Sequence, residues 1–164
     1  MHRRLRARKE GSSKSPDRAR ATRPNQREHI LARTVITFGT FDVLHVGHVR
    51  VLTRSAALGD RLVVGVSSDA LNFSKKGRNP VFSQDERVEI VSSLKVVDTV
   101  FVEESLEQKR EYVLEHQADV LVMGDDWSGK FDYLSDICKV VYLPRTPSVS
   151  TTAIIEHISA TGMG

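Results

Sequence analysis

Two histidines and two glycines stand out in the stretch Gly39-Thr-Phe-Asp-Val-Leu-His-Val-Gly-His48. His45 and His48 are three residues apart, so on the first turn of a helix they share one face. A helix start also presents unpaired backbone N–H groups and the positive end of the helix dipole, which together bind anions. Gly39 and Gly47 lack side chains, and we expect a phosphate to approach the backbone there. The chemistry indicated is binding and charge relief of a polyphosphate.

A basic segment offers further contacts for phosphate. Within residues 67–78, Lys75, Lys76 and Arg78 surround a glycine, and the segment is long for a plain connection between elements. We interpret it as a loop whose cations bind phosphate. A solvated basic loop without function explains the same residues.

An acidic segment and a hydroxyl-rich segment follow later in the chain. Asp125 and Asp126 stand beside the only tryptophan, where carboxylates can accept hydrogen bonds from a base or ribose, or bind a hydrated metal ion. The alternative is a tight turn.

In residues 145–152, the guanidinium of Arg145 provides a fork of hydrogen-bond donors, and three hydroxyl side chains stand at the start of a predicted helix. This combination predicts a second anion site. Ordinary Ser/Thr capping is the alternative there.

Alternating strands and helices must position these residues. Short, continuous apolar runs predict strands buried on both faces, at Thr34–Phe38, Arg61–Val66, Thr99–Val102, Val120–Met123 and Lys139–Leu143. Apolar residues at helical spacing, or cap signals, predict helices between them, at Val49–Leu58, Arg87–Leu94, Lys109–His116 and Ser150–Ala160. This alternation predicts an α/β fold, a Rossmann-like, doubly wound five-stranded parallel sheet with helices on both faces. Ligands bind at the carboxyl ends of the strands in such folds, which is where all four segments fall.

Two of these helices have capping-box signals. Ser83 with Glu86 precedes the helix at 87–94, and Ser105 with Gln108 precedes the helix at 109–116. We therefore expect each serine to accept a hydrogen bond from the first turn of its helix.

The net charge of +3 averages two unlike parts of the 164-residue chain. Residues 1–34 carry 11 lysines and arginines against 3 acidic residues, whereas residues 35–164 carry 13 against 18. The first part is also poor in large apolar residues, which predicts a basic disordered extension over 1–33 and a folded domain over 34–164. The acidic body is not expected to bind nucleic acid. For the extension we retain a solvated tail, a translation start assigned too far upstream, and an arm for nucleic acid or an anionic membrane.

The sequence shows no membrane span, no secretory signal and no pair of cysteines, and these features bear on the cellular compartment. No apolar run reaches the roughly 18 residues of a membrane span, and the basic start has no apolar core of a secretory signal. The single cysteine, Cys138, cannot form an intrachain disulfide, which favours a reducing cytoplasm.

Other chemistries fit the histidines less well. A zinc site would use both histidines and Asp42, but that set is narrower than zinc sites require. The sequence has no G-x-S-x-G nucleophile context and no Walker-type phosphate loop.

The glycine–histidine motif, with Met123-Gly-Asp-Asp-Trp127 and Arg145-Thr146 followed by Ser150-Thr-Thr152, resembles the glycerol-3-phosphate cytidylyltransferases. These belong to the cytidylyltransferase-like nucleotidyltransferases and supply CDP-glycerol for teichoic acid synthesis. The resemblance runs from Val35 to Thr152 and makes 34–164 a nucleotidyltransferase domain. It implies transfer of CMP from CTP to sn-glycerol 3-phosphate by direct in-line attack, with pyrophosphate released. It also implies Mg2+ carried by the triphosphate without direct protein ligands, and a homodimer.

The resemblance also implies roles for individual residues. The implied catalytic residues are His45, His48, Lys75, Arg145, Ser150 and Thr151. The implied nucleotide site comprises Gly39, Thr40, Phe41, Asp42, His45, Gly47, His48, Arg78, Asp125, Asp126, Arg145, Thr146, Ser150, Thr151 and Thr152. The implied acceptor-binding residues are Lys75, Lys95 and Lys109.

Three departures from the family pattern leave alternatives open. Lys95 replaces a family arginine and so lacks its bidentate fork, Pro147 stiffens the hydroxyl-rich loop, and the loop after Lys75 is one residue longer. One alternative is the same chemistry with an adenylyl donor and a sugar phosphate. Another is a nucleotide-binding module without turnover, which the two intact histidines disfavour.

Overall fold

The computed structural model describes residues 32–147 and 149–162. The basic extension predicted over residues 1–33 lies, except for its last two residues, outside the described part of the chain. Among the described residues, no helix has the length and apolar character that crossing a bilayer requires.

Five parallel strands form one sheet in the order β3-β2-β1-β4-β5. The strands are β1 Thr34–Gly39, β2 Arg61–Ser67, β3 Thr99–Glu103, β4 Val120–Gly124 and β5 Lys139–Leu143. Each agrees with a predicted strand to within a residue at either end. The first strand lies in the centre and the order reverses beside it, so the predicted doubly wound sheet is confirmed.

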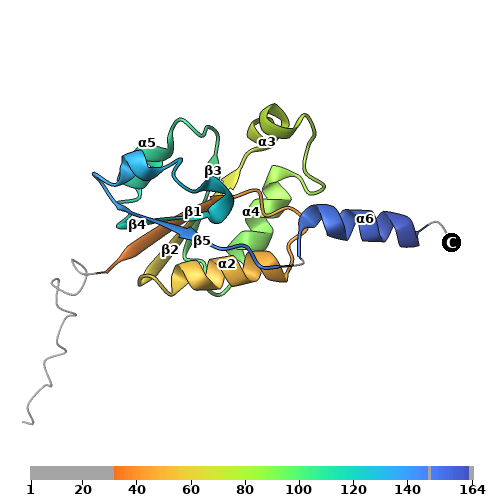
Figure 1. The fold of residues 1–164 in the computed structure, drawn as a ribbon, viewed down its shortest axis with the longest axis horizontal. Helices are drawn as coiled ribbons and strands as arrows, with labels where there is room; N and C mark the ends of the chain where they lie inside the picture. Colours follow the sequence, from red (N-terminus) through yellow and green to blue (C-terminus); the bar gives the residue numbers. More distant parts are fainter. Residues whose placement is uncertain (1–31, 148, 163–164) are drawn as a thin grey trace, which may run out of the picture. The chain divides into compact units, whose positions relative to one another are not determined.

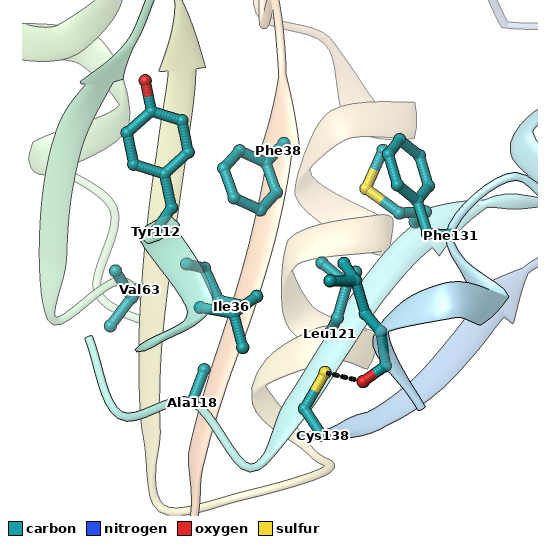
Figure 2. Packing of buried hydrophobic residues seen from close by; sticks show 11 residues of the cluster. Ile36, Phe38, Val63, Tyr112, Ala118, Leu121, Phe131 and Cys138 are labelled. Carbon is teal, nitrogen blue, oxygen red and sulfur yellow. Dashed lines mark hydrogen bonds between the residues drawn. The ribbon is translucent and has the colours of Figure 1, made fainter. Parts of the chain in front are cut away.

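Helices cover both faces of the sheet (Figure 1). The connections between strands contain α2 Val46–Ala56, α3 Asp69–Lys76, α4 Gln84–Ser92 and α5 Lys109–Glu115, with short 3-10 helices η1 Asp125–Trp127 and η2 Asp132–Leu134. The last helix, α6 Thr151–Thr161, follows β5 and projects away from the sheet. Leu52 of α2 and Val91 of α4 pack with Val35 and Val64 on one face. Tyr112 and Val113 of α5 pack on the opposite face, in the cluster shown in Figure 2. The sheet is therefore buried on both sides, which explains why its strands have continuous apolar runs.

One predicted loop is a helix. Residues 69–76, interpreted above as part of a basic loop, form α3, which Ser68 caps by accepting a hydrogen bond from the Leu71 N–H at 3.0 Å. Gly77 ends the helix in the left-handed conformation, with φ of 66°. Lys75 and Lys76 therefore sit on the last helical turn, where their charges complement the helix dipole.

The two capping-box predictions have opposite outcomes. Ser83 and Glu86 form the predicted box at the start of α4. The prediction for α5 is wrong, because that helix is preceded by Gln108 without a side-chain cap. The hydroxyl of Ser105 instead bonds the carboxylate of Glu107 within the loop. A serine and an acidic residue two positions apart thus satisfied each other locally.

Candidate active site

The last residues of all five strands line one cavity of about 750 Å³. These residues are Gly39, Ser67, Glu103, Gly124 and Leu143. The starts of α2 and α6 open into the same cavity, since His45 and Ser150 also line it. The two anion sites predicted from the sequence are therefore two walls of one pocket at the carboxyl edge of the sheet.

His45 and His48 cap the helix that they begin. The Nδ1 atom of His45 accepts a hydrogen bond from the Gly47 N–H at 3.1 Å, and Nδ1 of His48 accepts from the His45 N–H at 3.4 Å. The pair forms a reciprocal capping box in which two imidazoles take the places of serine and glutamate. Because each Nδ1 acts as an acceptor, the proton of the neutral ring resides on Nε2.

Burial keeps the two rings uncharged. Desolvation lowers the pKa of His45, and desolvation together with the neighbouring His45 lowers the pKa of His48 to about 4. Asp42 opposes this shift but does not cancel it. Near neutral pH the pair thus provides neutral N–H donors rather than two fixed positive charges.

The glycines of the motif make room for aromatic rings. A Cβ atom on Gly47 would lie 2.8 Å from Cε1 of His45, and one on Gly39 would lie 2.9 Å from the Phe41 ring. Both glycines line the cavity, so close approach of phosphate to their backbone stays a prediction, whereas the Cβ positions themselves are filled by neighbouring side chains. The glycines act indirectly, by letting the rings of His45 and Phe41 pack against the backbone.

Asp42 braces the turn between β1 and α2. Its carboxylate accepts hydrogen bonds from the backbone N–H groups of Val81 at 2.8 Å and Phe82 at 3.0 Å, and its own carbonyl accepts from the Thr151 hydroxyl at 3.0 Å. The flanking Phe41 and Val43 have φ of 53° and 45°, a conformation that non-glycine residues rarely adopt. Asp42 lines the pocket as predicted, but its carboxylate holds the site together.

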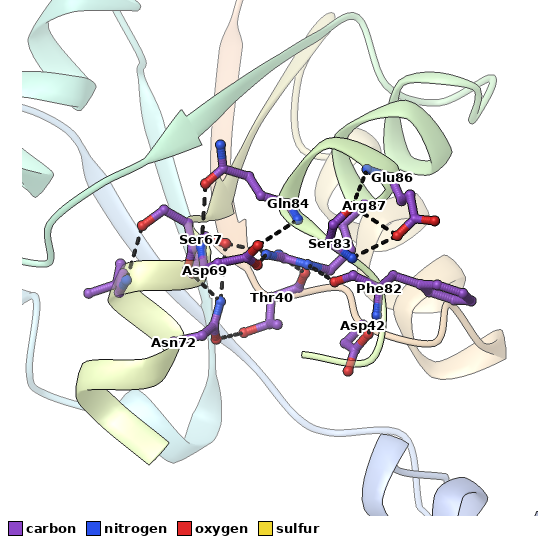
Figure 3. A network of polar contacts seen from close by, with 12 residues as sticks. Thr40, Asp42, Ser67, Asp69, Asn72, Phe82, Ser83, Gln84, Glu86 and Arg87 are labelled. Atoms are coloured by element: carbon purple, nitrogen blue, oxygen red, sulfur yellow. Dashed lines mark hydrogen bonds and ion pairs between the residues drawn. The ribbon is translucent and has the colours of Figure 1, made fainter. Parts of the chain in front are cut away.

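Arg87 links the loops behind the same wall. Its side chain is fully buried and its guanidinium donates to the carbonyls of Phe82, Thr40 and Ser67 and to the carboxylate of Asp69 (Figure 3). These partners lie directly after β1, at the end of β2, at the start of α3 and just before α4. A planar five-donor group is suited to this arrangement, which a lysine could not reproduce.

Two lysines and one glutamate form the opposite side of the pocket. Lys109 of α5 is buried, pairs with Glu103 of β3, and lies with Nζ 3.4 Å from the centre of the Phe38 ring. Burial lowers the pKa of Lys109 to about 8, although Glu103 acts against the shift. Lys75, on the last turn of α3, is exposed on its outer side, and partial desolvation lowers its pKa. In this structure Lys109 pairs with Glu103, and its predicted contact with an acceptor phosphate stays a prediction.

The hydroxyl-rich segment forms the outer wall. Ser150 caps α6 by accepting from the Ala153 N–H at 3.1 Å. Arg145 pairs with Asp126 at 2.9 Å, and both side chains are substantially exposed. Asp126 therefore has a protein partner in this structure, and the base or ribose contact expected for it stays a prediction.

The structure gathers most of the predicted site residues and leaves out two. Those that line the cavity are Gly39, Thr40, Phe41, Asp42, His45, Gly47, His48, Lys75, Arg78, Lys109, Asp126, Arg145, Thr146, Ser150, Thr151 and Thr152. Asp125 opens η1 with an exposed side chain and does not line the cavity. Lys95 is exposed and precedes β3, so it lies at the amino edge of the sheet and not at this pocket. Strand direction explains Lys95, since the carboxyl ends of the strands reach the cavity, whereas Asp125 follows such an end but does not contribute to the lining.

Sequence reasoning missed three residues that shape the pocket. Glu103 pairs with Lys109, Arg87 ties the loops, and Asn72 accepts a hydrogen bond from the Thr40 hydroxyl at 2.6 Å. Glu103 had a detectable signal, because it is a carboxylate directly after an apolar strand. Arg87 and Asn72 gave none, since Thr40, the residue that ties both of them to the pocket, lies far from each in sequence.

The carboxylates of the pocket that could hold magnesium already have protein partners. Asp42, Glu103 and Asp126 each accept hydrogen bonds or ion pairs from protein groups. Across residues 32–147 and 149–162, no three His, Cys, Asp or Glu side chains gather as a metal-binding group. The arrangement fits an ion that coordinates phosphate oxygens and enters with them.

Comparison with known proteins assigns the family. Residues 36–161 match the cytidylyltransferase-like family. A crystal structure described as the lipopolysaccharide core biosynthesis protein from Thermoplasma volcanium GSS1 superposes with a TM-score of 0.63 at 30% identity, covering 70% of this chain and 98% of that one. The chain therefore belongs to the cytidylyltransferase-like family.

Two relatives carry a more particular name. Glycerol-3-phosphate cytidylyltransferase of Bacillus subtilis (strain 168) is 49% identical over 127 residues, covering 77% of this chain and 98% of that protein. The Staphylococcus aureus (strain NCTC 8325 / PS 47) protein of the same name is 40% identical over 126 residues, covering 77% and 95%. The predicted resemblance to the glycerol-3-phosphate cytidylyltransferases is thus confirmed.

Proposed function

We propose that this protein transfers CMP from CTP to sn-glycerol 3-phosphate, giving CDP-glycerol and pyrophosphate. The observation that carries the proposal is that two anion-binding helix starts, at His45 and at Ser150, open into one cavity with a lysine-bearing wall. In this proposal a triphosphate and the acceptor phosphate bind in that cavity. The identity to glycerol-3-phosphate cytidylyltransferases supports this choice of donor and acceptor over an adenylyl donor with a sugar phosphate.

The reaction needs positioning and charge stabilisation and no covalent enzyme intermediate. A phosphate oxygen of the acceptor forms a bond to the α-phosphorus of CTP, and the bond from that phosphorus to the bridging oxygen breaks as pyrophosphate leaves. His45 and His48 donate Nε2–H groups to phosphate oxygens on which charge builds. Lys75 and Lys109 attract the acceptor phosphate, and Arg145 exchanges its Asp126 partner for nucleotide phosphate.

The remaining assignments are also part of the proposal. Thr40, Phe41 and Thr146 contact the nucleotide from the turn after β1 and the segment after β5, beside the hydroxyls of α6. Magnesium bound to the triphosphate supplies charge neutralisation. The lone cysteine supports a cytoplasmic location. A homodimer is supported by α6, which has no buried residue and exposes 61% of Ile158.

The test is a pyrophosphate-release assay with purified protein, magnesium, CTP and glycerol 3-phosphate. Wild-type protein should turn over, and His48→Ala should lose about 10²–10³-fold in kcat, as expected for removal of one donor to the transition state. His116→Ala, which removes a histidine on the far end of α5 that does not line the pocket, is the matched control. A parallel screen with ATP and sugar phosphates covers the rival substrate pair. Absence of pyrophosphate from CTP with any polyol phosphate would end the proposal.

A further inference from the structure

A buried carboxylate stands in the half of the pocket that should attract phosphate. Glu103 is the last residue of β3, and its side chain is 1% exposed. An uncompensated carboxylate there would repel an anionic acceptor and would be costly to bury. Its presence therefore needs an explanation beyond packing.

The carboxylate is held by two elements besides its own. One oxygen pairs with Nζ of Lys109 on α5, and the other accepts a hydrogen bond at 2.8 Å from the hydroxyl of Ser67, the last residue of β2. Both contacts are fully buried. Glu103 is consequently fixed, and it fixes the Lys109 ammonium in turn.

The ammonium group has a second partner that favours its charged form. The face of the Phe38 ring on β1 lies 3.4 Å from Nζ, a distance typical of a close cation–π contact. The charged groups acting on Lys109 are Glu103 from β3 and Lys75 from α3. The aromatic rings facing it are Phe38 and, at 5.7 Å, Phe131. Of these neighbours only Glu103 carries a negative charge.

We propose that Glu103 is a positioning residue for acceptor binding. It keeps the buried ammonium group of Lys109 positively charged on the side of the pocket that Lys75, Lys109 and Glu103 form. With Lys75 and Lys109 charged and Glu103 ionised, these three side chains together carry one net positive charge. That charge attracts a phosphate in a region where water screens little. The inference rests on the proposed function and adds a residue that sequence reasoning did not indicate.

Glu103→Gln is the test, since glutamine keeps the shape and the hydrogen bond to Ser67 but removes the charge. Lys109 would then lose its proton at a lower pH, because burial is no longer opposed. We expect the KM for glycerol 3-phosphate to rise about tenfold near pH 8, and the loss to shrink as the pH is lowered toward 6, where Lys109 regains its proton. The KM for CTP should stay within about twofold.

Two further variants separate charge from structure. Glu104→Gln makes the same change at the next residue, whose side chain is exposed and does not line the pocket, and should behave as wild type. Glu103→Asp keeps the charge and should retain the wild-type pH midpoint of the acceptor KM. An equal loss for both substrates in Glu103→Gln, or an acceptor KM with an unmoved pH midpoint, would overturn the proposal.

A measurement without turnover keeps this proposal distinct from the proposed function. The NMR signal of the Lys109 ε-methylene, assigned by comparison with Lys109→Arg, can be titrated in wild type and in Glu103→Gln. We expect the midpoint to fall by about one pH unit or more in the variant. If the Lys109 midpoint falls in Glu103→Gln but the wild-type protein does not turn over CTP and glycerol 3-phosphate, only the proposed substrates are wrong. An unchanged midpoint would refute the role of Glu103.

Discussion

The imidazole rings of His45 and His48 stack with their centres 3.8 Å apart and their planes inclined by 26°. Two positive charges at this separation would repel each other strongly in a partly buried site. The stacking therefore belongs to a neutral pair, in agreement with the capping hydrogen bonds that both Nδ1 atoms accept. Catalytic use of the pair depends on N–H donors that are already oriented before substrate arrives.

The acid stability of the protein should report the neutral state of His48. The folded-state pKa of about 4 lies below the ordinary value of 6.5, so the unfolded chain binds this proton first as the pH falls. The free energy of unfolding should be unaffected by this group above pH 6.5 and should decrease between pH 6.5 and 4. The full effect is roughly 3 kcal/mol.

Urea denaturation of wild type and His48→Asn near pH 7 and near pH 4.5 measures this effect. Asparagine retains an acceptor close to the Nδ1 position but does not titrate, so the variant should lose less stability on acidification than wild type. Carboxylates elsewhere in the protein titrate in the same pH range, but they contribute equally to the change in unfolding free energy of both proteins. Identical losses in the two proteins would contradict a neutral, buried His48.

The helix start depends on Gly47 in a way that sequence alone did not predict. Gly47→Ala places a methyl group 2.8 Å from Cε1 and 2.9 Å from Nδ1 of His45, so the ring must leave its position. We expect kcat to fall at least about tenfold while the midpoint of thermal unfolding changes little, since alanine is the better helix former. The neighbouring Val46→Ala, on an exposed side chain, is the control. Wild-type kcat in Gly47→Ala would show that the placement of His45 does not limit the reaction.

Local patterns predicted the framework because they reflect burial directly. The strands were found since each is a continuous apolar run covered on both faces, and the pocket was found since motifs follow the strand ends. The helix α3 was missed because its apolar residues are few: Leu71 is buried, whereas Phe73 is 56% exposed. Its signals were the capping Ser68 and the terminal Gly77, which punctuate a helix without an apolar stripe.

Pairings between distant residues were beyond the reach of the sequence. Arg87 resembles any helical arginine until the fold brings the carbonyls of Thr40 and Ser67 to its guanidinium. Lys95 illustrates the reverse error, because a basic residue near a family motif was assigned to the site although strand direction carries it to the other edge of the sheet. Periodicity identifies which residues are buried, but tertiary structure decides which of them meet.

The basic extension should be dispensable for catalysis. The residues that line the pocket lie between Thr37 and Ile155, and the family match begins at residue 36. A protein lacking residues 2–30 should therefore keep kcat and both KM values within about twofold of wild type. If the extension is an arm for polyanions, its removal should abolish retention on heparin at low salt. A large loss of kcat would place part of the extension in the catalytic domain.

Arg87 should be the most sensitive single position behind the pocket. Arg87→Met removes a guanidinium with four hydrogen-bond partners and leaves the carbonyls of Phe82, Thr40 and Ser67 without their donor, which should cost about 3–5 kcal/mol of unfolding free energy. Arg87→Lys should recover little of this loss, because one ammonium group cannot span the same acceptors. Chemical denaturation of both variants measures the cost.

Asp69→Asn distinguishes the buried contacts of Arg87 from its ion pair. The Asp69 side chain is 40% exposed, so loss of that charge should cost only about 1 kcal/mol or less. If the two changes destabilised the protein equally, the ion pair would be the dominant contact of Arg87. A much larger effect of Arg87→Met instead identifies the three carbonyls as the reason for a buried arginine here. The turn that carries His45 would then depend on α4, since Arg87 ties Thr40 to that helix.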